Sequence, residues 1–141
     1  PGSRSSLEGV ISGEKLRTLK GGESIEIDGL EVTGLEANHP ADEPLMFLVK
    51  SGDIRIFHGS DSSYTPAIEN RYADVAFVPV GTPSPTASVD DALKMVKATQ
   101  CKRVVPIHCT EDEASEFKRR VRSELPEVTV LLPKPMKVHK L

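Results

Sequence analysis

The apolar residues of this chain change their spacing at about residue 70, and this change limits the folds that the chain can adopt. Before that point, apolar residues alternate with polar ones at residues 24–28 and 30–36, and two short apolar runs follow at residues 45–50 and 54–57. Alternation is typical of strands with one buried face, and short apolar runs of strand-forming residues also indicate strands. Asp28-Gly29 and residues 51–53 (SGD) separate successive runs and are typical turn residues. The first part of the chain is therefore predicted to form two β-hairpins.

The second part of the chain alternates apolar strands with helical patterns. Residues 74–80 (DVAFVPV) form a nearly continuous apolar run, which is typical of a strand buried on both faces. Helices are predicted to begin at Ser88 and Thr110, because each can cap a helix and has an acidic residue three positions later. The remaining predicted strands cover residues 103–107, 128–132 and 136–139.

Hairpins followed by strand–helix–strand units predict an α/β domain with a mixed sheet and helices packed on one face. Residues 7–141 are predicted to form this single domain. Residues 1–6 (PGSRSS) are small, polar and unpatterned, and we expect them to be a disordered or cloning-derived end. In such sheets, polar groups just beyond the carboxyl ends of strands are the first candidates for function.

The composition argues against several classes of function. The chain has 141 residues, of which 38% are apolar, which is enough to bury a core without disulfides or a structural metal. The net charge is −3 and there is no basic run, so a nucleic-acid partner is not expected. No apolar stretch approaches the roughly 20 residues needed to span a bilayer. Both cysteines are expected to be reduced thiols, and we expect a cytoplasmic protein without a membrane partner.

Three polar residues directly follow predicted strands: His39, Asp61 and His108. Neutral imidazole and carboxylate groups are ligands of Zn²⁺, Mn²⁺ and Fe²⁺, and three strands of one sheet could bring their ends together. In the alternative interpretation each is an ordinary loop residue, and Asp61 forms an Asx turn with the serines that follow it. The spacing alone leaves both interpretations open.

Four stretches occur in an order that matches a known family. Residues 22–33 (GESIEIDGLEVT) are followed by 36–39 (EANH), and residues 56–62 (IFHGSDS) look like the motif I-Y-H-A-G-D-T. Residues 73–81 (ADVAFVPVG) look like A-D-V-A-L-L-P-I-G, and 104–108 (VVPIH) like the start of V-I-P-I-H-Y. Together these stretches resemble the metallo-β-lactamase-fold hydrolases, in the ascorbate-6-phosphate lactonase-like branch. Here Ser60 stands where glycine is usual, Ser62 where threonine is usual and Cys109 where tyrosine is usual.

The resemblance implies a metal-dependent hydrolase. It implies that His39 binds one metal, that Asp61 bridges two metals as the catalytic carboxylate, and that His108 binds the second metal. Zn²⁺ is the ion expected first, with Mn²⁺ or Fe²⁺ as alternatives. Water activated by the metal would attack a small-molecule ester, lactone or phosphoester.

One motif of the family is absent from the sequence. H-x-H-x-D-H, which supplies the other metal ligands, does not occur in these 141 residues. The chain therefore resembles the C-terminal half of an αββα sandwich, and we expect it to be inactive alone. Its open sheet face would be covered by the missing N-terminal half or by self-association as a dimer. The alternative hypothesis is a non-catalytic interaction or dimerisation module of the same fold, which would be indifferent to zinc.

Other residues near these motifs have two interpretations each. Thr82 and Thr86 lie between a buried strand and a helix N-terminus, where an anionic substrate could bind, or they belong to a proline-stiffened connector. His58 could hydrogen-bond a backbone group or a carboxylate beside the site, or it is an ordinary strand-end histidine. Cys109 could be a nucleophile, but a small packing residue is favoured.

Overall fold

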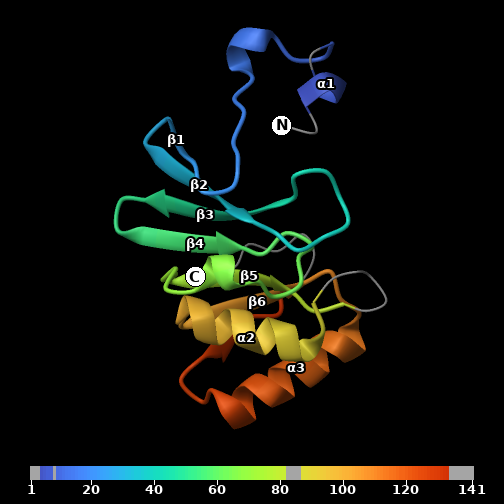
Figure 1. Ribbon diagram of the computed structural model, residues 1–141. Coiled ribbons are helices and arrows are strands. Elements are labelled where there is room, and N and C mark those ends of the chain that lie inside the picture. Colours follow the sequence, from blue (N-terminus) through green and yellow to red (C-terminus); the bar gives the residue numbers. More distant parts are fainter. Residues whose placement is uncertain (1–3, 8, 82–86, 134–141) are drawn as a thin grey trace.

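The computed structural model describes residues 4–7, 9–81 and 87–133. Within these ranges the chain forms a seven-stranded sheet in which strands that are neighbours in the sequence are also neighbours in the sheet (Figure 1). The first four strands are antiparallel: β1 (Ser24–Ile27), β2 (Leu30–Glu36), β3 (Leu45–Ser51) and β4 (Ile54–His58). Both predicted hairpins are confirmed, with strand ends within one residue of the predicted ones.

Each hairpin turn has residues with positive φ. Asp28 and Gly29 have φ values of 50° and 79° between β1 and β2, and Gly52 has a φ of 57° between β3 and β4. The pair of positive values at Asp28-Gly29 is that of the two-residue turn which matches the twist of a hairpin.

The second part of the sheet is parallel. It contains β5 (Val75–Pro79), β6 (Arg103–Ile107) and β7 (Thr129–Val130), and β5 pairs with β4. Helix α2 (Val89–Thr99) joins β5 to β6, and α3 (Glu111–Glu124) joins β6 to β7. β7 is shorter than the predicted strand 128–132, and the 3₁₀ helix η2 (Pro66–Ile68) was not predicted. The predicted strand 136–139 lies outside the described residues.

Both predicted helix starts are confirmed. The Ser88 hydroxyl accepts a hydrogen bond from the backbone N–H of Asp91 at 3.2 Å. Thr110 and Glu113 form a reciprocal capping box, in which each side chain accepts from the backbone N–H of the other residue. These bonds satisfy amide groups that have no partner within the first turn of a helix.

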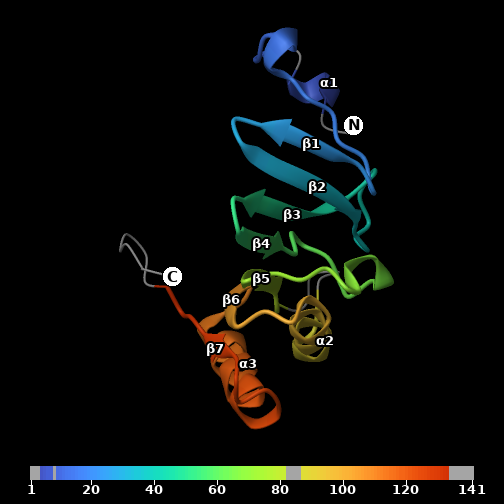
Figure 2. The same ribbon diagram turned by 90° about the vertical axis from the view of Figure 1, so that its left-hand side faces the viewer.

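The core lies between the helices and one face of the sheet (Figure 2). Register places Phe57, Ala76 and Val104 side by side on that face, and all three are buried. Phe117 and Val121 of α3 and the apolar residues of α2 belong to the same core. A mixed sheet with helices packed on one face is the predicted fold class, and the structure confirms it.

The opposite face of the antiparallel strands carries apolar side chains that are only partly covered. Strand pairing places the following residues on this face, which we call the open face: Ile25, Ile27, Leu30, Val32, Phe47, Val49, Ile54 and Ile56. Ile54 is 56% exposed and Ile27 is 42% exposed, whereas Phe57 on the helix side has no exposed surface. Two short elements, α1 (Arg4–Leu7) and η1 (Gly13–Lys15), lie beyond β1 (Figure 1). None of the helices in the described ranges is long and apolar enough to cross a membrane.

Candidate functional site

His39 and Asp61 meet at the carboxyl ends of β2 and β4. His39 Nε2 lies 3.3 Å from Asp61 Oδ2, although the two residues are far apart in the sequence. Their side chains are 26% and 34% exposed, so the pair is open to solvent but partly enclosed. β2 and β4 run in the same direction on either side of β3, and both therefore end at the same edge of the sheet.

Hydrogen bonds join the two loops that carry this pair. The Ser62 hydroxyl accepts from the backbone N–H of Asn38 at 2.8 Å and donates to the Ser63 carbonyl at 2.6 Å. The Ser63 N–H donates to the Asn38 carbonyl at 3.1 Å, and the Asn38 side-chain amide donates to the Ser63 hydroxyl at 2.7 Å. Each loop residue in these bonds is next to His39 or within two positions of Asp61. The bonds therefore fix the imidazole and the carboxylate relative to each other.

His58 stabilises the turn that precedes Asp61. Its Nδ1 accepts a hydrogen bond from the backbone N–H of Ser60 at 3.0 Å, and its ring stacks on Phe77 with ring centres 5.9 Å apart. Burial, and secondly the positive charge of nearby His108, lower the pKa of His58. A lowered pKa favours the neutral ring, whose Nδ1 is then available as an acceptor. His58 thus accepts a hydrogen bond from the backbone, and its role beside the site stays a prediction.

Ser60 adopts an unfavourable backbone conformation in this turn. Its φ is 52°, in the left-handed region that glycine adopts at lower cost. This is the position at which the family motif has glycine. The turn itself is closed by a hydrogen bond from the Ser62 N–H to the Gly59 carbonyl at 3.2 Å.

His108 follows β6 at the same edge of the sheet as the pair. Its φ is 52°, and the backbone of Gly81 lies directly against it. A Cβ added to Gly81 would lie 1.7 Å from the His108 carbonyl oxygen, so only glycine fits there.

The His39–Asp61 pair fits two adjacent positions of a metal coordination sphere. Two ligand atoms bound to one tetrahedral Zn²⁺ through bonds of about 2.0–2.1 Å lie about 3.3–3.4 Å apart. The observed separation of 3.3 Å agrees with that value. Among the residues that the structure describes, however, no group of three or more His, Cys, Asp or Glu side chains could hold a metal. Among the described residues, His108 and the other possible ligands do not join the pair in a group of three.

The remaining candidates have little support as catalytic groups. Burial, and secondly the charge of Glu113, raise the pKa of the Cys109 thiol, which opposes formation of the nucleophilic thiolate. Cys109 packs against the core, as expected for a packing residue. Thr82 and Thr86, the predicted substrate-binding residues, lie outside the described residues.

The sequence did not indicate the groups that hold the site together. Asn38, Ser62 and Gly81 are common turn and loop residues, and their partners are distant in the sequence. The positive φ of Ser60 could be predicted only from the family motif, which has glycine at this position.

The fold and the polar groups at one sheet edge define this chain as a protein of the metallo-β-lactamase fold. The chain belongs to the beta-lactamase superfamily, because the model of the beta-lactamase superfamily domain matches residues 5–108. A UPF0173 protein of Pyrococcus furiosus is 32% identical over 114 residues, which are 77% of this chain and 53% of that protein. A UPF0173 metal-dependent hydrolase of an Exiguobacterium species is 36% identical over 72 residues, which are 46% of this chain and 30% of that protein.

Solved structures show the same fold at lower sequence identity. The metallo-beta-lactamase fold protein YhfI of Bacillus subtilis has a TM-score of 0.76 at 14% identity, with 94% of this chain and 59% of that chain covered. The metallo hydrolase Igni18 of Ignicoccus hospitalis has a TM-score of 0.71 at 20% identity, with 84% and 57% covered. The chain spans about half the length of the first curated relatives that it matches.

Proposed function

We propose that this chain contributes metal ligands to the active site of a metal-dependent hydrolase, and that His39 and Asp61 are two of them. The contact of 3.3 Å between His39 Nε2 and Asp61 Oδ2 carries the proposal, because it holds an imidazole and a carboxylate at the spacing of two ligands on one ion. The name of the Exiguobacterium relative, a metal-dependent hydrolase, supports the same activity. His108, at the end of β6, is proposed as a ligand of a second ion, and Asp61 as the bridge between the two.

The residues of this chain would hold and orient the metal, for which Zn²⁺ is the first choice and Mn²⁺ or Fe²⁺ the alternatives. When bound, such an ion lowers the pKa of a coordinated water from about 15.7 to about 7 and so supplies a nucleophile at neutral pH. His58 keeps the turn before Asp61 in place through the Ser60 amide. The proposed substrates are small esters, lactones or phosphoesters, including the lactones of the branch that the motifs resemble.

We further propose that the remaining ligands come from residues outside these 141. The support is that H-x-H-x-D-H does not occur in the sequence and that the described residues add no third ligand to the pair. On this proposal the 141-residue chain alone is inactive and binds metal more weakly than a complete site would.

Zinc titration of the 141-residue chain by isothermal calorimetry tests the proposal. His39→Ala and Asp61→Asn should each lower the affinity at least tenfold, because loss of a ligand costs at least as much as loss of a group that orients one. Asp53→Asn is the matched control, since Asp53 is an exposed aspartate in the β3–β4 turn at the opposite sheet edge. Equal affinities for all four proteins, or no zinc binding by any of them, would contradict the proposal.

A second candidate function is that of a non-catalytic interaction module, and the open face favours it. Its apolar side chains include Ile54 at 56% and Ile27 at 42% exposure. Contiguous exposed apolar surface of this kind usually marks an interface. The proposed partner is a second copy of the chain or the missing half of the sandwich.

Sedimentation velocity over a range of protein concentrations tests self-association. Ile54→Lys should shift the chain toward the monomer, because a dimer formed through the open face would bury the lysine charge, and burying an unpaired charge costs free energy. Leu132→Lys is the control, since Leu132 is a similarly apolar residue, 40% exposed, that is not part of the open face. A wild-type chain that stays monomeric at all concentrations would exclude the dimer. Zinc binding that depends on His39 would favour the hydrolase over a module without metal.

A further inference from the structure

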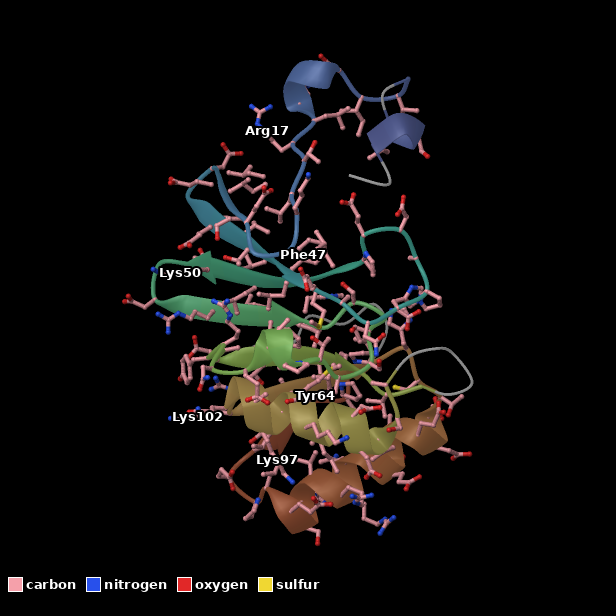
Figure 3. The ribbon with its side chains drawn as sticks, viewed as in Figure 1. Arg17, Phe47, Lys50, Tyr64, Lys97 and Lys102 are labelled. Atoms are coloured by element: carbon pink, nitrogen blue, oxygen red, sulfur yellow. The ribbon has the colours of Figure 1, made fainter. Side chains whose placement is uncertain are left out.

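A basic pocket lies on the helix side of the sheet, at the edge opposite His39 and Asp61. Its volume is about 340 Å³, which is at the small end of the range for small-molecule sites. The residues lining it are Gly22, Ser24, Glu31, Thr33, Leu48, Lys50, Arg55 and Arg71. Arg55 is at the start of β4 and His58 is at the end of the same strand, so this pocket is separate from the candidate metal site. Figure 3 labels Lys50 near the end of β3.

Two cations face each other directly in this pocket. Strand register places Lys50 opposite Arg55 on adjacent strands, and like charges in such pairs repel. Glu31 is opposite Lys50 on the other side, but no ion pair within 4.0 Å joins them. In the part of the chain that the structure describes, the side-chain cations of Lys50, Arg55 and Arg71 form no ion pair within that distance. The Asp74 carboxylate instead accepts a hydrogen bond from the Arg55 backbone N–H at 2.8 Å. Three positive charges and the single negative charge of Glu31 thus line the pocket, and none of the three cations is ion-paired.

The pocket also holds its arginine in position and offers a hydroxyl donor. The Arg55 guanidinium lies over the Tyr72 ring, 5.7 Å from its centre, and Arg55 is half-buried. The Ser24 and Thr33 hydroxyls are 2.7 Å apart and share one hydrogen bond. Only one of their two O–H groups is used in that bond, so the other remains available to a ligand.

We propose that Lys50, Arg55 and Arg71 form a binding site for a small ligand with a phosphate group. A guanidinium binds phosphate oxygens in pairs and a lysine adds a point charge, which together suit a dianion. Glu31 lines one side of the pocket and Glu26 lies opposite it on β1, so an anion that extends beyond the pocket toward β1 is repelled. The site therefore selects a compact anion over a nucleic acid.

Thermal unfolding at constant ionic strength tests this site, with inorganic phosphate and glycerol 3-phosphate as probes and chloride as the reference. At ten times its dissociation constant, a ligand should raise Tm by about 4 °C. Lys50→Gln and Arg71→Gln should remove most of this increase. Lys102→Gln is the control, because Lys102 is exposed and is not among the residues lining the pocket (Figure 3). This substitution removes one positive charge, as the two test substitutions do.

The repulsion between Lys50 and Arg55 adds a readout that does not depend on the ligand. In chloride, the Tm of Lys50→Gln should be higher than that of the wild type. In phosphate, this difference in Tm should become smaller or change sign. A larger response to glycerol 3-phosphate than to inorganic phosphate identifies a phosphorylated small molecule as the ligand, and equal responses identify free phosphate. A phosphate response no larger than that to chloride, or one unchanged in both variants, would overturn the proposal. Tighter binding of a single-stranded oligonucleotide, lost in the same variants, would also overturn it.

Discussion

Ser62→Ala should destabilise the protein strongly, although the substitution removes only one hydroxyl group. Ser62 has no exposed surface, and its hydroxyl takes part in two hydrogen bonds, from the Asn38 N–H and to the Ser63 carbonyl. An alanine leaves an amide and a carbonyl without these partners. Each lost bond costs about 1 kcal/mol, and more where the remaining group stays buried, so the expected loss is about 2–3 kcal/mol.

Urea unfolding measures this loss. With a slope of about 2 kcal/mol per molar urea, the midpoint of Ser62→Ala should fall by about 1 M. Ser63→Ala is the matched control, because Ser63 exchanges two hydrogen bonds with the same residue, Asn38, but at an exposed position. Water replaces exposed partners, so this control should lose less than about 1 kcal/mol.

The same substitution should weaken the candidate metal site. Asn38 precedes His39 and Ser62 follows Asp61, so loss of the bond between them frees the two loops. The zinc affinity of Ser62→Ala should therefore fall below that of Ser63→Ala. Equal stabilities and equal zinc affinities for the two variants would refute the idea that the buried hydroxyl sets the geometry of the pair.

Three further predictions concern single positions around the site. Gly81→Ala should destabilise the protein by about 2 kcal/mol or more in urea unfolding, because its methyl group would overlap the His108 carbonyl; a loss below about 0.5 kcal/mol would contradict this. Ser60→Gly should stabilise it by about 0.5–1 kcal/mol, since glycine adopts the φ of 52° at less cost, although it gains more freedom when unfolded. The pKa of His58 is lowered in the folded protein, so the unfolded chain binds a proton at His58 more readily than the folded protein does. The contribution of neutral His58 to the free energy of unfolding is therefore fully present above pH 6.5 and is lost as the pH falls from 6.5 toward the lower pKa of the folded state. In EDTA the urea midpoint should therefore be lower at pH 5.5 than at pH 7.5, and His58→Asn, which keeps an acceptor for the Ser60 amide, should lose most of that difference; an undiminished pH effect would assign it to other groups.

Local patterns were sufficient to predict most of the fold. The Asp28-Gly29 turn, the continuous apolar run of β5 and the capping pair Thr110–Glu113 each depend on residues that are close in sequence. The 3₁₀ helix Pro66–Ile68 was missed because it is a single turn without a periodic pattern. β7 is shorter than predicted, since its apolar run pairs with β6 over only two residues.

The candidate site could be predicted only in part. Strand ends and the family motifs indicated His39, Asp61 and His108, and the structure brings the first two into contact. The bond between Asn38 and Ser62 depends on the arrangement of β2 and β4 around β3, which no local pattern encodes. The close approach of Gly81 to His108 likewise arises from the pairing of β5 with β6.

The most direct test of the central claim is an imidazole ¹⁵N NMR titration of the 141-residue chain with zinc. If His39 and Asp61 bind one ion, the Nε2 resonance of His39 should shift on zinc addition, and Asp61→Asn should reduce that shift strongly while Asp53→Asn leaves it intact. If the His39 resonance does not respond to zinc, or responds equally in Asp61→Asn, the pair is not a metal-binding unit and the proposed hydrolase site is wrong.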